Sequence, residues 1–214
     1  MSASPIENRP PEQPRKKLSA STLLRNSHLP LIICAIALFI QFSGEDASVW
    51  LRYDRSGILA GEVWRIVTGH LVHLSWPHLL MNVIGLLLIW LLFGHFIRPL
   101  SWLWVFLTCT IGISTGMLLL NPELEWYVGL SGILHGMFVA GAVISIKAGY
   151  RAEILLLLAF VAKLAWEQVI GPLPGSAEFA GGNVIVDAHL YGAISGLIVA
   201  GVLISLANNT GRSP

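Results

Sequence analysis

The chain has 214 residues, of which 55% are hydrophobic and only 12% charged, with a formal net charge of +1 and a mean hydropathy of +0.71. A soluble domain needs more charge to cover its surface. Four stretches contain no Asp, Glu, Lys or Arg: residues 66–97, 99–122, 126–146 and 188–211. Each is as long as the roughly 20 residues that a helix needs to cross a bilayer. The composition excludes a soluble globular protein, predicts a polytopic membrane protein, and gives no indication of a nucleic-acid partner.

Residues 1–26 are polar, contain four prolines and a basic run at 15–17, and are expected to form a disordered cytoplasmic tail. The apolar stretch 29–42 is short enough to be the core of a signal peptide. No small-x-small cleavage site follows it, because Phe42 and Glu45 occupy the decisive positions. We therefore favour an uncleaved first membrane span, with the signal peptide as the open alternative.

Hydrophobic patterning predicts an all-α fold with six transmembrane helices. The expected spans are 27–43, 77–97, 101–120, 130–147, 153–171 and 188–206. The fifth is the least regular, because Lys163 and Glu167 interrupt it. We expect one membrane domain at 27–207, followed by a short cytoplasmic tail at 208–214.

Lys and Arg are distributed unequally between the two sides that six spans define. The side with both tails and the turns at 98–100 and 147–152 carries nine: Arg9, Arg15, Lys16, Lys17, Arg25, Arg98, Lys147, Arg151 and Arg212. The opposite side carries three, all in one long loop. Because basic loops stay in the cytoplasm, the amino terminus is expected to be cytoplasmic. Spans two, four and six then begin near the outer face, so polar residues at their starts should lie at a similar depth.

Ser131 stands at the start of the fourth predicted span, within Gly129-Leu130-Ser131-Gly132. A lone serine in a membrane helix usually serves packing, and that interpretation stays open. The flanking glycines, however, let the backbone approach closely and leave the hydroxyl accessible. A helix amino terminus also offers free N–H groups and the positive end of the helix dipole to a developing oxyanion. Ser131 is therefore the candidate nucleophile.

A serine nucleophile needs a base, and His189, at the start of the sixth span, is the candidate. Small residues recur along both helices: Gly132, Gly136 and Ala140 on the fourth span, Gly192 and Gly196 on the sixth. Small residues at this spacing let two membrane helices pack closely. We expect contact along these stripes to bring Ser131 within hydrogen-bond reach of His189. The alternative is that the stripes serve packing alone and that His189 caps a helix.

His78 and Asn82 are four residues apart, so they should share one face of the second span. Both side chains can donate hydrogen bonds to an oxyanion, although, taken alone, an interhelical hydrogen-bonded pair explains them as well. His70 and His73 nearby invite a metal interpretation. The sequence has no His-Glu-x-x-His pattern, and the block 66–97 has no carboxylate. We therefore expect neither a metal nor another cofactor.

Four motifs in this order resemble the rhomboid intramembrane serine proteases, over residues 61–206. They are Glu62-Val63-Trp64-Arg65, His73 followed by His78-x-x-x-Asn82, Gly129-x-Ser131-Gly132, and Ala188-His189-x-x-Gly192-x-x-x-Gly196. The resemblance implies a six-helix rhomboid-like bundle and a Ser131–His189 dyad without a third acidic member. It also implies an oxyanion hole formed by the Ser131 N–H, His78 and Asn82, and a Trp64-Arg65 loop lying partly in the outer leaflet.

One departure points to a branch of that family. Typical bacterial rhomboids carry a tyrosine one turn after the serine, stacked on the catalytic histidine, where this chain has His135. With Asp187 before Ala188-His189, and Trp166-Glu167-Gln168 late in the fifth span, the chain most resembles the rhombosortase branch. That resemblance implies removal of carboxyl-terminal Gly-Gly sorting tails from exported proteins, with water or a lipid-derived amine resolving the acyl-enzyme.

His135, Glu167, Gly129 and Gly132 are candidates for the substrate pocket or its support. His135 shares a helix face with Ser131, and packing is an equal alternative. Lys163 and Glu167 are four apart, so the simplest interpretation is an intrahelical ion pair. The alternative is that Glu167 orients a histidine or recognises a basic or amine group.

The expected function is that of an intramembrane serine endopeptidase, multi-pass in the bacterial inner membrane, cleaving single-span substrates near the outer face. Its expected partners are the lipid bilayer and membrane-anchored proteins with a carboxyl-terminal hydrophobic helix, and no nucleic acid. The rivals are a general rhomboid protease with other substrates, a non-catalytic rhomboid relative that binds membrane helices, and a small transporter. Intact Ser131 and His189 disfavour the non-catalytic rival, and only Lys163 with Glu167 approaches the paired mid-depth charges of a transporter.

Overall fold

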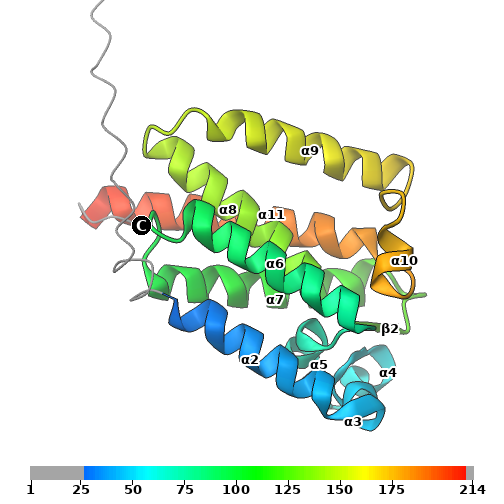
Figure 1. Cartoon of the computed structure of the whole chain (residues 1–214). Coiled ribbons are helices and arrows are strands. Elements are labelled where there is room, and N and C mark those ends of the chain that lie inside the picture. The colour runs from blue at the N-terminus through cyan, green and yellow to red at the C-terminus, as the bar shows by residue number, and fades with distance from the viewer. Residues whose placement is uncertain (1–26, 211–214) are drawn as a thin grey trace, which may run out of the picture.

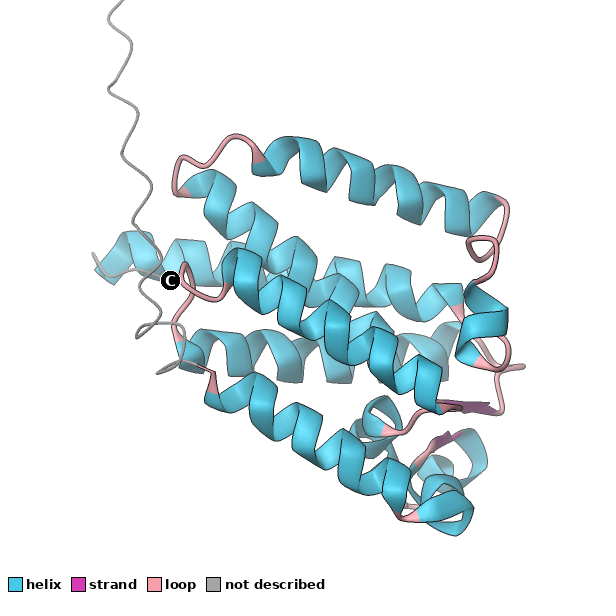
Figure 2. Cartoon of the chain, viewed as in Figure 1, coloured by secondary structure: helices cyan, strands magenta, loops and turns pink. Residues whose placement is uncertain are grey.

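The structure is a computed structural model that describes residues 27–210; the tail segments 1–26 and 211–214 lie outside the described residues. Within this range the chain forms helices and one two-stranded ladder (Figures 1 and 2). The elements are α2 (His28–Phe42), α3 (Gly44–Leu51), β1 (Tyr53–Asp54), α4 (Arg55–Leu59), α5 (Arg65–Thr68), η1 (Gly69–Leu71), α6 (Trp76–Phe93), α7 (Pro99–Leu120), β2 (Trp126–Tyr127), α8 (Ser131–Lys147), α9 (Glu153–Val169), α10 (Ser176–Ala180) and α11 (Val186–Thr210).

All six segments predicted as spans are helical, and their ends lie within a few residues of the expected ones. Helix α6 begins at Trp76 because Ser75 caps it: the Ser75 hydroxyl accepts a hydrogen bond of 3.2 Å from the His78 N–H. Helix α11 runs on to Thr210, past the boundary expected at 207.

Three helices within residues 27–210 are long and apolar enough to cross a membrane, namely α6, α7 and α11. Helices α2 and α8 are apolar but shorter, and α9 carries Glu153, Lys163 and Glu167. Large apolar side chains face outward on several helices, including Phe39 (73% exposed), Leu155 (72%) and Val169 (84%). The chain is a multi-pass membrane protein, and a crossing by all six helices stays a prediction.

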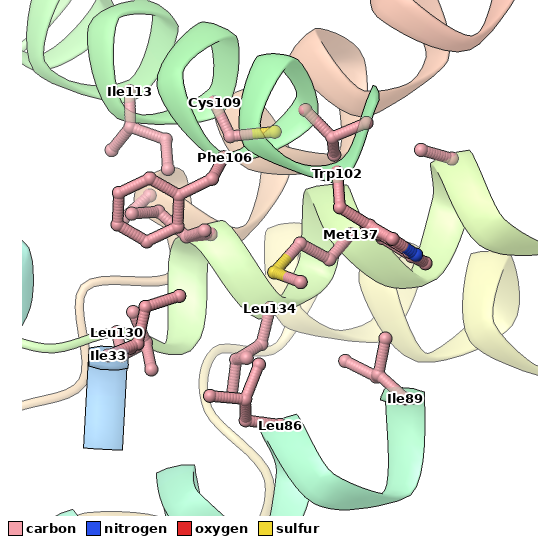
Figure 3. Packing of buried hydrophobic residues seen from close by; sticks show 14 of the residues in the cluster. Ile33, Leu86, Ile89, Trp102, Phe106, Cys109, Ile113, Leu130, Leu134 and Met137 are labelled. Atoms are coloured by element: carbon pink, nitrogen blue, oxygen red, sulfur yellow. The ribbon is translucent and has the colours of Figure 1, made fainter. Parts of the chain in front are cut away.

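Helix α8 lies at the centre of the bundle, packed against α11, α7, α6 and α9. Figure 3 shows Leu134 and Met137 reaching from α8 into the space between Cys109 on α7 and Leu86 on α6. Met137 is 1% exposed and Leu86 and Cys109 are fully buried. Because lipid tails are as apolar as these side chains, close packing rather than exclusion of water holds the helices together.

Helices α2 and α9 lie at opposite edges of the bundle (Figure 1). Helix α9 packs chiefly against α8 and α11, at one side of the site described below.

The short elements α3–α5, β1, β2 and α10 gather at one end of the bundle, and the carboxyl-terminal end of α11 lies at the other (Figure 1). The two strands pair antiparallel, with Tyr53 opposite Tyr127. Arg65 is 8% exposed; its Nη1 donates to the carbonyls of Val49 (2.9 Å) and Arg52 (3.0 Å), and its Nε pairs with Glu62. This guanidinium fixes the loop that leads into α6.

Candidate active site

Ser131 is the first residue of α8, immediately after the turn that follows β2. The turn depends on Gly129, whose φ is +125°, a conformation that side chains rarely adopt. A Cβ at this position would lie 3.0 Å from Cε1 of His78 and 4.0 Å from the Ser131 hydroxyl. The Tyr127 hydroxyl donates a hydrogen bond of 2.7 Å to the Gly129 carbonyl, and this bond stabilises the turn. Because Gly129 has no side chain, the space between Ser131 and His78 stays open.

His189 lies in the first turn of α11 and is 5% exposed. Its Nε2 is 3.0 Å from the Ser131 Oγ. Helices α8 and α11 pack closely where their glycines face each other. There is no room for a side chain there: a Cβ on Gly192 would lie 1.9 Å from the Gly132 carbonyl oxygen, and one on Gly196 would lie 2.1 Å from the Gly136 carbonyl oxygen. The predicted small-residue stripes are therefore in backbone contact, and this contact brings serine and histidine together.

The other nitrogen of His189 faces Glu167 on α9. The Nδ1 of His189 is 3.0 Å from the Glu167 Oε2, and the Glu167 side chain is 3% exposed. Lys163, one turn earlier on α9, donates to the same oxygen at 2.7 Å. In the structure Glu167 forms the intrahelical ion pair with Lys163 and also lies within hydrogen-bond distance of His189.

His135 lies one turn below Ser131 on α8. Its Nδ1 donates to the Ser131 carbonyl at 2.7 Å, and its Nε2 contacts the Lys163 ammonium. The ring is stacked on that of His189, with centroids 3.9 Å apart and an angle of 5° between the planes. His135 thus contacts Ser131, Lys163 and His189, and together with Glu167 these residues form one hydrogen-bonded cluster.

His78 and Asn82 approach from α6. Asn82 is 4% exposed, and its Nδ2 has no hydrogen-bond partner among residues 27–210. The His78 Nδ1 accepts a long hydrogen bond of 3.4 Å from the Leu74 N–H, and its ring packs edge-on against His73, with centroids 5.0 Å apart. An unpaired buried amide donor is costly, so Asn82 is available to an acceptor that enters the site.

A cavity of 460 Å³ opens beside Ser131, between α6 on one side and α8 and α9 on the other. Its polar lining is formed by His78, Asn82, Ser131, His135, Lys163, Glu167, Ser176 and His189. The rest of its wall is mostly apolar and includes Met81, Leu88, Leu92, Phe138, Phe160 and Leu173. Two predicted support residues, Gly129 and Gly132, do not line it and instead shape the turn and the helix contact.

A second serine–histidine pair lies elsewhere in the fold. The His70 Nε2 is 3.0 Å from the Ser114 Oγ, and Ser114 donates to the Ile66 carbonyl at 2.8 Å. His70 is fully buried and Ser114 is 2% exposed, and neither lines the cavity beside Ser131. Burial lowers the pKa of His70 to about 4. The hydrogen bond of this pair connects helix α7 with the segment that precedes α6. Because both side chains are buried and outside the cavity, a substrate cannot reach them.

His135, Glu167 and His189 also form a group of metal-ligand types, with one ligand atom of each lying within 4.8 Å of the others. The Lys163 ammonium contacts both His135 and Glu167. A fixed positive charge inside the group opposes a metal cation, so the residues fit a hydrogen-bonded cluster better than a metal centre.

The model of the rhomboid domain family matches residues 60–206 of the chain, which include every residue of this cluster. The chain belongs to the rhomboid family. Rhomboids are intramembrane serine proteases that act on membrane-embedded substrates. No curated protein sequence matches the chain significantly. The matched range runs from just before α5 to residue 206 within α11, and it leaves α2, α3, β1 and α4 of this rhomboid outside.

Two features of this rhomboid site are not predicted from the sequence. The contact between Lys163 and His135 joins residues 28 positions apart on different helices, and no pattern in the sequence indicates it. The ring centroid of Phe160 lies 5.0 Å from that of His135, whereas the sequence marks Phe160 only as part of an apolar span. Phe160, Lys163 and Glu167 stand at positions i, i+3 and i+7, and this shared helix face is the one indication that the sequence offers.

Proposed function

We propose that this rhomboid is an active serine endopeptidase in which Ser131 is the nucleophile and His189 its general base. The observation that carries the proposal is the 3.0 Å approach of the His189 Nε2 to the Ser131 Oγ, at the wall of a cavity large enough for several residues of substrate. Such a contact between nucleophile and base is what acyl transfer requires.

The proposed reaction is acyl transfer. His189 takes the Ser131 proton as Oγ bonds to the peptide carbonyl carbon, and the carbonyl electrons move to its oxygen. His189 then gives the proton to the leaving amine as the C–N bond breaks. Water, or an amine, resolves the acyl-enzyme by the same steps in reverse order.

Charge on the carbonyl oxygen needs donors. Helix α8 begins at Ser131, so its first N–H groups lack intrahelical partners. His78 and the unpaired Asn82 Nδ2 line the same cavity. We assign these three groups to the oxyanion hole, where each donor typically contributes about 2.7–4 kcal/mol to the transition state.

For the substrate, we propose single-span proteins cleaved near the outer membrane face, and in particular exported proteins with carboxyl-terminal Gly-Gly sorting tails. The apolar walls of the cavity suit a hydrophobic helix, and His135 and Glu167, at positions that mark the rhombosortase resemblance, both touch His189. An amine acceptor in place of water is part of the same proposal.

For topology, we propose a domain at 27–207 crossing the bacterial inner membrane six times, with the 1–26 and 208–214 segments in the cytoplasm. The excess of Lys and Arg in the loops of that side supports this orientation. Ser131, His189 and His78 stand at the starts of α8, α11 and α6, consistent with one depth near the outer face.

The test is co-expression with an exported protein that carries a Gly-Gly tail, followed by mass measurement of the product. We expect the wild type and Ser145→Ala to remove the tail, and Ser131→Ala and His189→Ala to leave it intact. Ser145 is the matched control because it is a buried serine on the same helix, and within residues 27–210 its hydroxyl is hydrogen-bonded only to the Ala142 carbonyl. An intact tail with wild type, alongside cleavage of another membrane-anchored substrate, would leave the general rhomboid protease and overturn the sorting-tail substrate.

A further inference from the structure

The contacts of His189 extend beyond a serine–histidine dyad. Its imidazole is hydrogen-bonded through both nitrogens, to the Ser131 Oγ at Nε2 and to the Glu167 Oε2 at Nδ1. The two side chains of the His189–Glu167 contact are 6% and 3% exposed, so water does not compete for it. The resemblance implied a dyad without an acidic member, and this chain has a carboxyl group at that place.

We propose that Glu167 is the positioning residue of a Ser131–His189–Glu167 triad; the inference rests on the proposed function of Ser131 and His189. A carboxylate can only accept hydrogen bonds, so it fixes the proton of neutral His189 on Nδ1. The lone pair then lies on Nε2, facing the Ser131 hydroxyl. Without this contact, either nitrogen of the imidazole could carry the proton, and only one of the two tautomers can act as the base.

Lys163 and His135 support the carboxylate. Lys163 donates to the Glu167 Oε2 at 2.7 Å, so the buried negative charge has a counter-charge one helical turn away. His135 donates its Nδ1 proton to the Ser131 carbonyl at 2.7 Å, which leaves its Nε2 lone pair toward Lys163. The hydrogen bonds form a closed ring that starts at the Ser131 hydroxyl and returns to the Ser131 carbonyl.

This ring has a consequence for the reaction. When His189 takes the Ser131 proton, it becomes an imidazolium whose Nδ1–H points at Glu167. The carboxylate is already in place and needs no reorganisation, so it stabilises the charge that develops in the transition state. Among the described residues Glu167 is hydrogen-bonded to His189 and Lys163 and not to Ser131, so it acts through His189.

The test measures inactivation by a serine-directed fluorophosphonate in proteoliposomes of the full chain. Saturation kinetics separate the binding constant KI from the rate of the chemical step, kinact. We expect Glu167→Gln, which removes the charge and keeps the shape, to lower kinact by at least about 10²-fold while KI stays within about twofold. Glu167→Asp should recover part of the loss. Glu153→Gln is the matched control, the same change at the far end of α9, and should behave as wild type.

A fold defect is separated from the proposed effect by a second variant. Lys163→Met combined with Glu167→Gln removes both charges of the buried pair, and we expect the same loss of kinact with a normal thermal transition. Wild-type kinact in Glu167→Gln, or in the double variant, would overturn the triad. Equal labelling of wild type, Ser131→Ala and His189→Ala would instead refute the proposed function, so the two failures are distinct.

Discussion

The ring of His135 lies flat against the ring of His189, 3.9 Å between centroids and 5° from parallel. The stack holds the candidate base from the side, while Ser131 and Glu167 hold it at its two nitrogens. An imidazole fixed in this way has little freedom to turn away from the serine. This arrangement would preorganise His189 for its proposed role as base, and each of the contacts that hold it can be removed separately.

His135→Phe should retain the stack and lose the two hydrogen bonds of His135, so we expect kinact of phosphonate labelling to fall by no more than about tenfold. His135→Ala also removes the ring stack, which contributes about 0.5–1.5 kcal/mol, so we expect kinact of this variant to fall further than that of His135→Phe. Equal rates for the two variants would show that stacking does not position His189.

Gly192→Ala should disrupt the contact of α8 with α11. Its Cβ would lie 1.9 Å from the Gly132 carbonyl, so we expect destabilisation by about 1–3 kcal/mol and loss of phosphonate labelling. Gly201→Ala, on the same helix with open space around the new Cβ, is the control and should be neutral or stabilising by up to about 1 kcal/mol. Thermal unfolding in detergent, with labelling measured in parallel, checks both. Unchanged labelling in Gly192→Ala would contradict the packing account.

Gly129→Ala combines strain at a positive φ with a tight contact, since the new Cβ would lie 3.0 Å from Cε1 of His78 and the ring would have to shift by a few tenths of an ångström. Gly171→Ala imposes similar strain at φ +106° where nothing lies within 4 Å. We expect both to lose about 1–3 kcal/mol of stability, and only Gly129→Ala to lose labelling as well. The comparison separates the effect of the contact with His78 from the effect of backbone strain. Equal labelling of Gly129→Ala and Gly171→Ala would contradict the role given to Gly129.

Asn82→Leu removes the unpaired donor and keeps the number and branching of the side-chain heavy atoms. We expect kinact to fall by about 10²–10³-fold with KI unchanged, because the donor acts on charge that develops only in the transition state. A rise in KI with unchanged kinact would instead make Asn82 a substrate-binding residue.

The sequence predicts the long helices well, because each is a mostly apolar stretch of helical length, and only α9 is interrupted by charged residues, at Lys163 and Glu167. It does not predict the short elements α3–α5, η1, β1, β2 and α10. The pairing of Tyr53 with Tyr127 is short and joins distant residues, so no local period indicates it. Arg65, buried against backbone carbonyls, was recognised only through a motif of the family.

Within the site, the approach of Ser131 to His189 followed from the glycine spacing, since two small-residue stripes have few other ways to pack. The bond from His189 to Glu167 was one of two open alternatives, because helix rotation cannot be read from a sequence that is apolar on most faces. The side on which α9 presents Lys163 and Glu167 is set by packing against α8 and α11.

The most direct test of the central claim is to locate the phosphonate adduct by mass spectrometry of the labelled wild-type chain. We predict an adduct on Ser131, absent from Ser131→Ala and His189→Ala and retained in Ser114→Ala, which removes the serine of the second, fully enclosed pair. An adduct on Ser114 or any other residue, or equal labelling of all four proteins, would contradict the account.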